Sequence, residues 1–369
     1  MAKIKVLHII KSLGRGGAEM LLPETLKLHD GTNFEFHYIY FLPWKNQMVE
    51  SIKQAGGRVT CISASNNLQL LKKHDEVLNY SKKFEIDIIH CHLPWSAFVG
   101  RIIYKKTNIP VIYTEHNVQE KFHFATKYLN KISFNSQSMA IGVSKDVTQS
   151  INRNINVKIP VQTVSNGVNT NKFQRDKEKG KFIRDELNIP SDAIVIGNIA
   201  VFRKQKGLED WIIAFKKITK DHDNVYGILV GAGPEEEKIK ELVRKEELTV
   251  KLKLPGLQTD TVSYFSAMNI FMMSSLFEGL PIALLEAMSM ECAIVSTKAG
   301  GVVEAIRDKK DGLLCEISDQ EKLATLTISL LENKEKLSQM QRAARSRAEH
   351  NFSLKSMVGT LEQIYYKYS

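Results

Sequence analysis

Short apolar, β-rich runs recur along the chain, and stretches with helical periodicity lie between them. Strands that alternate with helices predict parallel sheets with helices on both faces. The pattern therefore predicts an α/β chain with two doubly wound domains. The expected strands are Ile4–Ile10, Phe34–Phe41, Arg58–Ile62, Ile86–Cys91, Val111–Thr114, Ala140–Val143 and Val161–Val164, then Ala193–Ala200, Tyr226–Val230, Lys251–Leu254, Ile270–Met273, Ala293–Ser296 and Gly312–Cys315.

The division between the two domains is expected in Asn166–Gly180, which has no apolar period and contains Asn-Gly, Asn-Thr-Asn and a charged run. A length of 369 residues suits two domains. We expect an N-terminal domain over residues 1–168, a C-terminal domain over 169–350 and a final segment, 351–369, with a tyrosine-rich helix at Leu354–Tyr368.

The composition is typical of a globular protein, with 43% hydrophobic and 25% charged residues. No apolar run approaches the roughly 20 residues of a membrane-spanning helix. The start, MAKIKVLHII, resembles a first strand and is not followed by a small-residue cleavage site. Four scattered cysteines without a C-x-x-C pair favour a reducing compartment. A cytoplasmic protein is therefore expected.

The net charge of +10 is uneven, because residues 1–168 carry 21 Lys and Arg against 12 Asp and Glu, and the remainder carries 30 against 29. Such an excess indicates either a solvated surface or attraction to anionic phosphate or lipid. Four short segments mix apolar and basic residues: Leu68–Lys73, Tyr80–Phe84, Lys121–Phe124 and Lys127–Leu129. They predict ordinary amphipathic helices or, alternatively, docking on an anionic membrane surface.

The segment EGLPIALLEAM places two carboxylates, Glu278 and Glu286, eight positions apart across Pro281. Proline favours the first helical position, so Glu278 is expected in the loop and Glu286 in the helix. The free N–H groups at the helix start suit phosphate. A nucleoside diphosphate sugar matches this order of hydroxyls, phosphates and ribose. The alternative is a solvated surface helix with two unrelated acids.

This segment, followed by STKAGGVVEAI and DGLL, resembles the C-terminal half of retaining glycosyltransferases of family four. With GRGGAE at Gly14–Glu19, the resemblance covers essentially the whole chain. It implies the GT-B fold, in which two facing Rossmann-like domains form an interdomain cleft and the last helix packs back on the first domain.

The resemblance also implies the reaction. A hexose-type sugar would move, with retention and without a metal or cofactor, from a nucleotide-sugar donor. A UDP-sugar is favoured, and a GDP-sugar is the alternative. The acceptor would be a glycan or lipid-linked molecule bound on the N-terminal domain, in cell-surface polysaccharide or glycolipid synthesis. An anionic membrane surface is a further expected partner, with the protein peripheral on the inner membrane face, and no nucleic acid is expected.

Site residues follow from the same resemblance. Glu278 would hold hydroxyls of the donor sugar and Glu286 those of the ribose, with His116, after the strand that ends at Thr114, facing the transferred sugar. A lone histidine is otherwise more often structural. The remaining donor-binding candidates are Gly16, Gly17, Arg203, Lys206, Leu257, Gly279, Leu280 and Pro281.

Three glycine-containing or charged loops have rival interpretations. A dinucleotide fingerprint at Gly14–Gly17 would need glycine at position 19, which is Glu19, and no acid ends the second strand. Arg203 and Lys206 suit a diphosphate clamp or a plain charged loop. Arg203 departs from the common family form, which has Gly-Arg two to three residues earlier, where this chain has Gly197-Asn198. Gly231–Pro234 is a tight turn or a loop near the nucleotide.

Metal motifs are weak. Asp221-His222-Asp223 precedes a strand and so lies at the amino end of the sheet, away from the expected site. Alternation along a strand would divide His90-Cys91-His92 between two faces. Two rival functions remain open: a nucleotide-sugar epimerase on the same fold, and a non-catalytic sugar-nucleotide-binding subunit, which predicts a degraded carboxylate pair or basic clamp.

Overall fold

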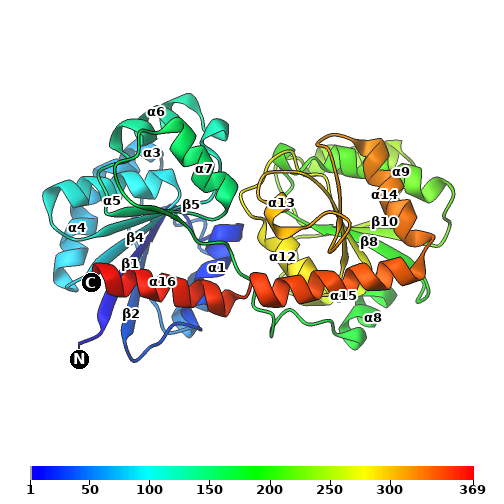
Figure 1. Ribbon diagram of the computed structural model, residues 1–369, viewed down its shortest axis with the longest axis horizontal. Helices are drawn as coiled ribbons and strands as arrows, with labels where there is room; N and C mark the ends of the chain where they lie inside the picture. Colours follow the sequence, from blue (N-terminus) through cyan, green and yellow to red (C-terminus); the bar gives the residue numbers. More distant parts are fainter. Residues whose placement is uncertain (1) are drawn as a thin grey trace. The chain divides into compact units, whose positions relative to one another are not determined.

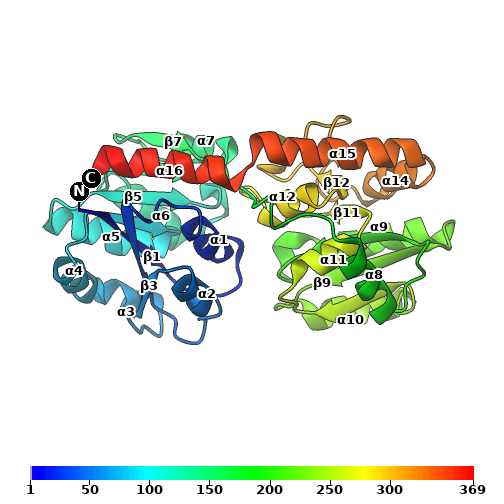
Figure 2. The same ribbon diagram turned by 90° about the horizontal axis from the view of Figure 1, so that it is seen from below.

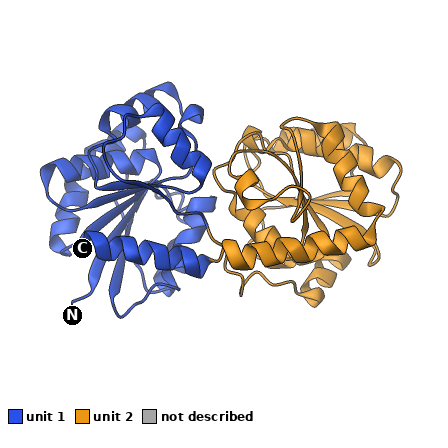
Figure 3. Cartoon of the chain, viewed as in Figure 1, with its two compact units in different colours: residues 1–166, 354–369 blue, residues 167–353 orange. Residues whose placement is uncertain are grey.

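The computed structural model describes residues 2–369, which form two compact units (Figure 3). Unit 1 contains the chain up to Asn166 together with Leu354–Ser369, and unit 2 is Gly167–Ser353. The division therefore falls after residues 166 and 353, where the sequence predicts 168 and 350. The chain leaves unit 1 once and returns to it for its last helix.

Unit 1 contains a sheet of seven parallel strands in the order β3-β2-β1-β4-β5-β6-β7 (Figure 1). Its inner strands are almost fully buried, which is why they appear in the sequence as nearly continuous apolar runs. The strands are β1 (Ile4–Ile10), β2 (Phe34–Tyr40), β3 (Arg58–Cys61), β4 (Ile88–His92), β5 (Val111–Glu115), β6 (Met139–Gly142) and β7 (Val161–Thr163).

Helices alternate with these strands, as the pattern predicts. They are α1 (Gly17–Leu26), α2 (Val49–Gln54), α3 (Asn67–Lys72), α4 (His74–Lys83), α5 (Pro94–Lys106), α6 (Phe124–Ser133) and α7 (Lys145–Asn154), with a 3₁₀ turn, η1 (Gln119–Lys121), before α6. The last helix, α16 (Leu354–Tyr368), has the predicted bounds.

Helix α16 completes the core of unit 1. Leu361, Ile364 and Tyr365 pack with residues of β1, β2 and β4 in one hydrophobic cluster, and Figure 2 shows the helix lying over that sheet. Two polar contacts fix it: the Tyr365 hydroxyl is 2.7 Å from His90 Nδ1, and Glu362 Oε1 is 2.9 Å from His29 Nδ1.

Unit 2 contains six parallel strands in the order β10-β9-β8-β11-β12-β13. Trp211, Phe215 and Ile218 are fully buried, so their helical spacing marks core, as predicted. The strands are β8 (Ile194–Ile199), β9 (Val225–Val230), β10 (Leu252–Gly256), β11 (Ile270–Met273), β12 (Ala293–Thr297) and β13 (Leu313–Cys315).

The helices of unit 2 cover both faces of this sheet (Figure 1). They are α8 (Lys177–Glu186), α9 (Leu208–Lys220), α10 (Glu236–Lys245), α11 (Thr261–Ala267), α12 (Ile282–Ser289), α13 (Val302–Ala305), α14 (Gln320–Leu331) and α15 (Lys334–Asn351), with the 3₁₀ turn η2 (Lys204–Lys206). None of the helices between residues 2 and 369 is both long and apolar enough to span a bilayer.

The predicted linker is wrong in its second part, because helix α8 begins at Lys177. The segment before it is fixed to unit 2 by arginine side chains. Arg175 donates to the carbonyl oxygens of Ser266, Met268 and Met290 at 2.7 to 3.1 Å. These partners lie far along the chain, so the polar segment resembles a linker although it is bound tightly.

Candidate active site

Two loops of unit 2 bring a predicted cation into contact with a predicted carboxylate. Lys206 follows β8 and Glu278 follows β11, two strands that are neighbours in the sheet. Lys206 Nζ is 2.6 Å from Glu278 Oε1, with side chains 23% and 6% exposed. Because the carboxyl ends of parallel strands share one edge, the sheet order joins residues that the resemblance assigns to different parts of a donor.

The loop after β8 is held to the loop after β11 by its backbone. Gly207 has φ of +58°, and a Cβ there would lie 2.2 Å from the Ser274 carbonyl oxygen. The Ser274 hydroxyl donates to the Gly207 carbonyl oxygen at 2.8 Å, and the Gln205 side chain donates to the Phe277 carbonyl oxygen at 2.9 Å. Lys206 is thereby fixed beside Glu278. Gln205 was missed from the sequence, where it appears as one polar residue of a charged loop.

Helix α12 begins one residue later than predicted. Pro281 is its N-cap, with ψ of 123°, and is not the first helical residue. Its carbonyl oxygen already accepts from the Leu285 N–H at 3.4 Å while its own backbone stays extended. Glu278 nevertheless lies in the preceding loop and Glu286 within the helix, as predicted.

The start of α12 is a buried turn between two buried carboxylates. Gly279, Leu280 and Pro281 are buried, and Glu278 and Glu286 are each 6% exposed. The first backbone N–H groups of a helix have no intrahelical acceptor, so this turn can donate to an anion. The buried acids contradict the solvated-surface alternative.

Two glycines after β12, Gly300 and Gly301, lie next to the loop that carries Glu278. The Gly301 N–H donates to the Glu278 carbonyl oxygen at 3.4 Å, and Gly300 adopts φ of +55°. Both belong to the STKAGG motif, for which the sequence suggested no role of its own. Their position beside Glu278 indicates that the motif shapes this loop.

The other unit 2 candidates lie at the same edge of the sheet but are less enclosed. Arg203 is exposed and precedes η2, and Leu257 follows β10 with 57% of its surface exposed. Gly231 and Gly233 lie close against the loop after β8, because Cβ atoms there would lie 1.9 Å from the Ala200 and 2.4 Å from the Phe202 carbonyl oxygen.

In unit 1, the glycine loop leads directly into α1. Gly16 is the N-cap, with φ of −90°, and Gly17 is the first helical residue. A Cβ on Gly16 would lie 2.3 Å from Glu19 Oε2, whose carboxylate accepts from the Ser12 hydroxyl at 3.1 Å. Glu19, which argues against a dinucleotide fingerprint, thus closes back on this turn.

His116 lies just after β5, next to a cluster of buried histidines. His116 Nε2 is 3.5 Å from His92 Nδ1, and His92 Nε2 is 2.9 Å from His8 Nδ1. Burial lowers the pKa of His116 to about 4 and holds the pKa values of His8, His90 and His92 well below the ordinary value. These imidazoles are therefore neutral near pH 7. They line a cavity of about 30 Å³, room for a water molecule or two.

His8, His90 and His92 have ring nitrogens within 4.8 Å of one another, a spacing that could surround a metal ion. However, His90 uses both nitrogens, at 2.7 Å, for Tyr365 and Thr114, and the His8–His92 separation of 2.9 Å is that of a hydrogen bond. Hydrogen bonding therefore accounts for the cluster. As predicted, Cys91 lies on the other face of the strand, toward Gly100.

Glu115 is a buried acid that the sequence did not single out. It accepts from the Tyr113 hydroxyl, the His116 N–H at 2.9 Å and the Gln119 side chain at 2.9 Å. Burial raises the pKa of the Glu115 carboxyl to about 7. Its position before His116 was the available signal, and its contacts fix the backbone that carries His116.

The acidic pair Asp221 and Asp223 lies between α9 and β9, at the amino end of that strand. Parallel strands present opposite ends to opposite edges of a sheet. The pair is therefore remote from the Lys206–Glu278 contact, as the sequence predicts.

Comparisons with known proteins agree with this arrangement. Residues 16–172 match the family model Glycosyltransferase Family 4, and residues 180–347 match Glycosyl transferases group 1. The N-acetyl-alpha-D-glucosaminyl L-malate synthase of Bacillus anthracis is 26% identical over 307 residues, 81% of this chain and 79% of that protein. The UDP-Gal:alpha-D-GlcNAc-diphosphoundecaprenol alpha-1,3-galactosyltransferase of Escherichia coli is 22% identical over 385 residues, 99% of this chain and 97% of that protein.

Among solved structures, Anabaena HepE in complex with UDP and glucose matches with a TM-score of 0.88 at 20% identity, covering 99% of this chain and 100% of that one. That likeness extends over both parallel sheets. The chain therefore belongs to the family 4 glycosyltransferases and has the GT-B fold.

Proposed function

We propose that this glycosyltransferase moves a hexose-type sugar from a UDP-sugar, with retention of configuration and without a metal ion. The observation that carries the proposal is the Lys206–Glu278 contact beside the start of α12. It combines a carboxylate that can accept from sugar hydroxyls, a cation and open N–H groups within one edge of one sheet. The E. coli relative is named for UDP-Gal and the HepE structure contains UDP, and both favour uridine as the base of the donor.

Each residue has a separate task in this proposal. Glu278 accepts hydrogen bonds from the donor sugar, and Glu286 accepts them from the ribose. Lys206, Arg203 and the first turn of α12 stabilise the negative charge that develops on the leaving diphosphate. The donor's own phosphate takes the acceptor proton, so no protein nucleophile is required. Neutral His116 donates to a hydroxyl of the transferred sugar.

The acceptor is proposed to be lipid-linked, with the enzyme peripheral on an anionic membrane face and active in cell-surface polysaccharide or glycolipid synthesis. The excess of 21 basic over 12 acidic residues in 1–168 supports this, as does the diphosphoundecaprenol in the name of the E. coli relative. A lipid-linked acceptor needs an enzyme that can reach the bilayer surface.

The direct test is a thermal-shift screen of UDP- and GDP-sugars followed by product analysis. A ligand at 100 times its dissociation constant stabilises by about 2.7 kcal/mol, so the preferred donor should stand out. Nuclear magnetic resonance of the glycoside formed should show the anomeric configuration of the donor. An inverted product, or an epimerised sugar from donor alone, would overturn the proposal.

A further inference from the structure

Helix α6 of unit 1 turns its largest apolar side chains outward. Phe124, Tyr128 and Ile132 are 80%, 56% and 61% exposed, whereas Asn130 is completely buried. The three exposed residues are spaced four apart and so form one stripe along the helix. A surface helix of a globular protein ordinarily buries its apolar stripe. The outer face of α6, defined by Phe124, Tyr128 and Ile132, is therefore inverted.

Buried polar contacts hold α6 in this orientation. The Arg101 guanidinium, on α5, donates to Asn130 Oδ1 at 2.7 Å and to the Ser133 hydroxyl at 2.9 Å. Asn130 in turn donates to Gln119 Oε1 at 2.8 Å. Turning the helix to hide its apolar stripe would break these bonds to a buried arginine, which is costly.

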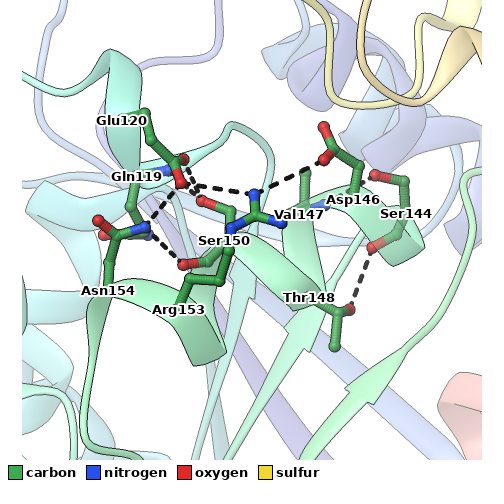
Figure 4. A network of polar contacts seen from close by, with 9 residues as sticks. All are labelled: Gln119, Glu120, Ser144, Asp146, Val147, Thr148, Ser150, Arg153 and Asn154. Carbon is green, nitrogen blue, oxygen red and sulfur yellow. Dashed lines mark hydrogen bonds and ion pairs between the residues drawn. The ribbon is translucent and has the colours of Figure 1, made fainter.

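The segment that leads into α6 is anchored as well (Figure 4). In η1, the Gln119 N–H donates to the Ser150 hydroxyl at 2.8 Å, and Glu120 accepts from Asn154 at 2.8 Å and from Arg153 at 3.4 Å. Gln119 and Glu120 of η1 are thus both bound to side chains of α7. The exposure of the apolar stripe is a fixed property of unit 1.

The charge around the outer face of α6 indicates what covers it. Helix α6 contains two lysines, Lys127 and Lys131, and no Asp or Glu, and Lys121 lies three residues before it. Lys121 and Lys131 are exposed, and Lys127 is half-buried. A second copy packed face to face would bring these lysines against one another, which is repulsive. Apolar side chains flanked by lysines complement a bilayer surface that carries anionic headgroups.

We propose that the outer face of α6 is the surface by which unit 1 docks on an anionic lipid bilayer. The inference rests on the lipid-linked acceptor proposed above. Phe124, Tyr128 and Ile132 enter the acyl boundary, while Lys121, Lys127 and Lys131 lie at the headgroups. The docking helix is joined to the candidate site, because Gln119 links Asn130 to Glu115.

Vesicle sedimentation tests the proposal. The wild-type protein should bind vesicles of equal parts phosphatidylglycerol and phosphatidylcholine at low salt and dissociate at about 1 M salt, where the Debye length falls to about 3 Å. A triple variant, Phe124→Ser with Tyr128→Ser and Ile132→Ser, should lose at least about tenfold in partitioning. Retained binding by this variant, or equal binding to pure phosphatidylcholine, would overturn the inference.

Matched controls are available elsewhere on the surface. Phe182, on α8, and Val250, between α10 and β10, are 66% and 68% exposed and belong to unit 2, so Phe182→Ser and Val250→Ser should leave vesicle binding unchanged. Loss of binding in either control would contradict a docking surface confined to α6. Light scattering checks the second-copy alternative, because a wild-type dimer that the triple variant dissociates would overturn bilayer docking.

Measurements of UDP binding show whether the docking proposal and the proposed function fail separately. The triple variant should show the same thermal shift with UDP as the wild type, since α6 and the Lys206–Glu278 contact belong to different units. An unshifted wild type that still binds vesicles would refute the donor proposal and leave the docking surface standing. If the triple variant melts early, Phe124→Ser alone replaces it, with the same expected direction.

Discussion

At the scale of single residues, the function proposed for Glu278 depends on its negative charge, because its buried carboxylate is paired with Lys206. Glu278→Gln keeps the shape but removes the charge that accepts from sugar hydroxyls, so turnover should fall by about 10²-fold. Glu286→Gln should mainly weaken donor binding. Steady-state kinetics with the preferred UDP-sugar measure both, and Glu291→Gln, an exposed acid just after α12, is the control. Wild-type turnover in Glu278→Gln would refute its assignment.

A substitution at His116 should affect sugar transfer and nucleotide binding differently. It belongs to unit 1, whereas the predicted nucleotide contacts belong to unit 2. His116→Ala should therefore slow transfer far more than it weakens UDP binding, which calorimetry measures independently. His350→Ala, an exposed histidine on α15, is the matched control. Unchanged transfer would return His116 to a structural role.

The buried histidines predict acid-sensitive stability of unit 1. A histidine with a lowered pKa stays neutral in the folded chain while the unfolded chain takes up a proton, so stability is lost as pH falls from about 6.5 toward 4. At pH 5, His116 alone should cost about 2 kcal/mol. Glu115 opposes this, because its raised pKa lets the folded chain bind a proton first, yet one carboxyl does not offset four imidazoles.

Urea unfolding at pH 7 and pH 5, followed by hydrogen exchange of β1 and β4, measures this effect. The free energy of unfolding of unit 1 should be lower at pH 5 than at pH 7. Equal or greater stability at pH 5 would show that the histidines are solvated in solution.

At the scale of elements, the turn at Gly207 decides whether the loop after β8 can hold Lys206. Gly207→Ala places a methyl group against the Ser274 carbonyl in a left-handed conformation, which should cost about 1–3 kcal/mol and weaken UDP binding. Thermal melting and calorimetry would show both effects. Gly31→Ala, where a Cβ meets nothing within 4 Å, should change neither, and a neutral Gly207→Ala would mean that the loop adapts.

The strands were predictable and the contacts between loops were not. All thirteen predicted strands lie within two residues of the observed ones. The inner strands gave the clearest signal, because strands buried on both faces leave nearly uninterrupted apolar runs. The linker was misjudged in its second part because the carbonyl partners of Arg175 are distant in sequence. Glu278 and Lys206 were found singly, and their pairing required the β8–β11 adjacency. Glu115 was missed. The segment of α6 was left open between an ordinary amphipathic helix and a docking surface, because periodicity does not reveal which face of a helix is buried.

At the scale of the whole molecule, unit 2 is proposed to bind the donor and unit 1 to bind the acceptor. Neither of these proposed roles requires a metal ion. Lys206, Arg203 and the start of α12 would supply the positive charge that a divalent ion supplies elsewhere. Transfer activity should therefore survive dialysis against a chelator. Loss of activity that magnesium or manganese restores would contradict the metal-independent proposal, and His8→Ala would then test the histidine cluster as its source.

The return of the chain to unit 1 at α16 has a consequence for biosynthesis. Unit 2 is one continuous segment, so it can fold as soon as it leaves the ribosome. Unit 1 cannot, because the face of its sheet that receives Tyr365 stays uncovered until the last helix has been translated. During that interval the aromatic residues of β2 are open to chaperones and to aggregation. A chain truncated after Ser353 and released from the ribosome should therefore carry a folded unit 2 and a protease-sensitive unit 1.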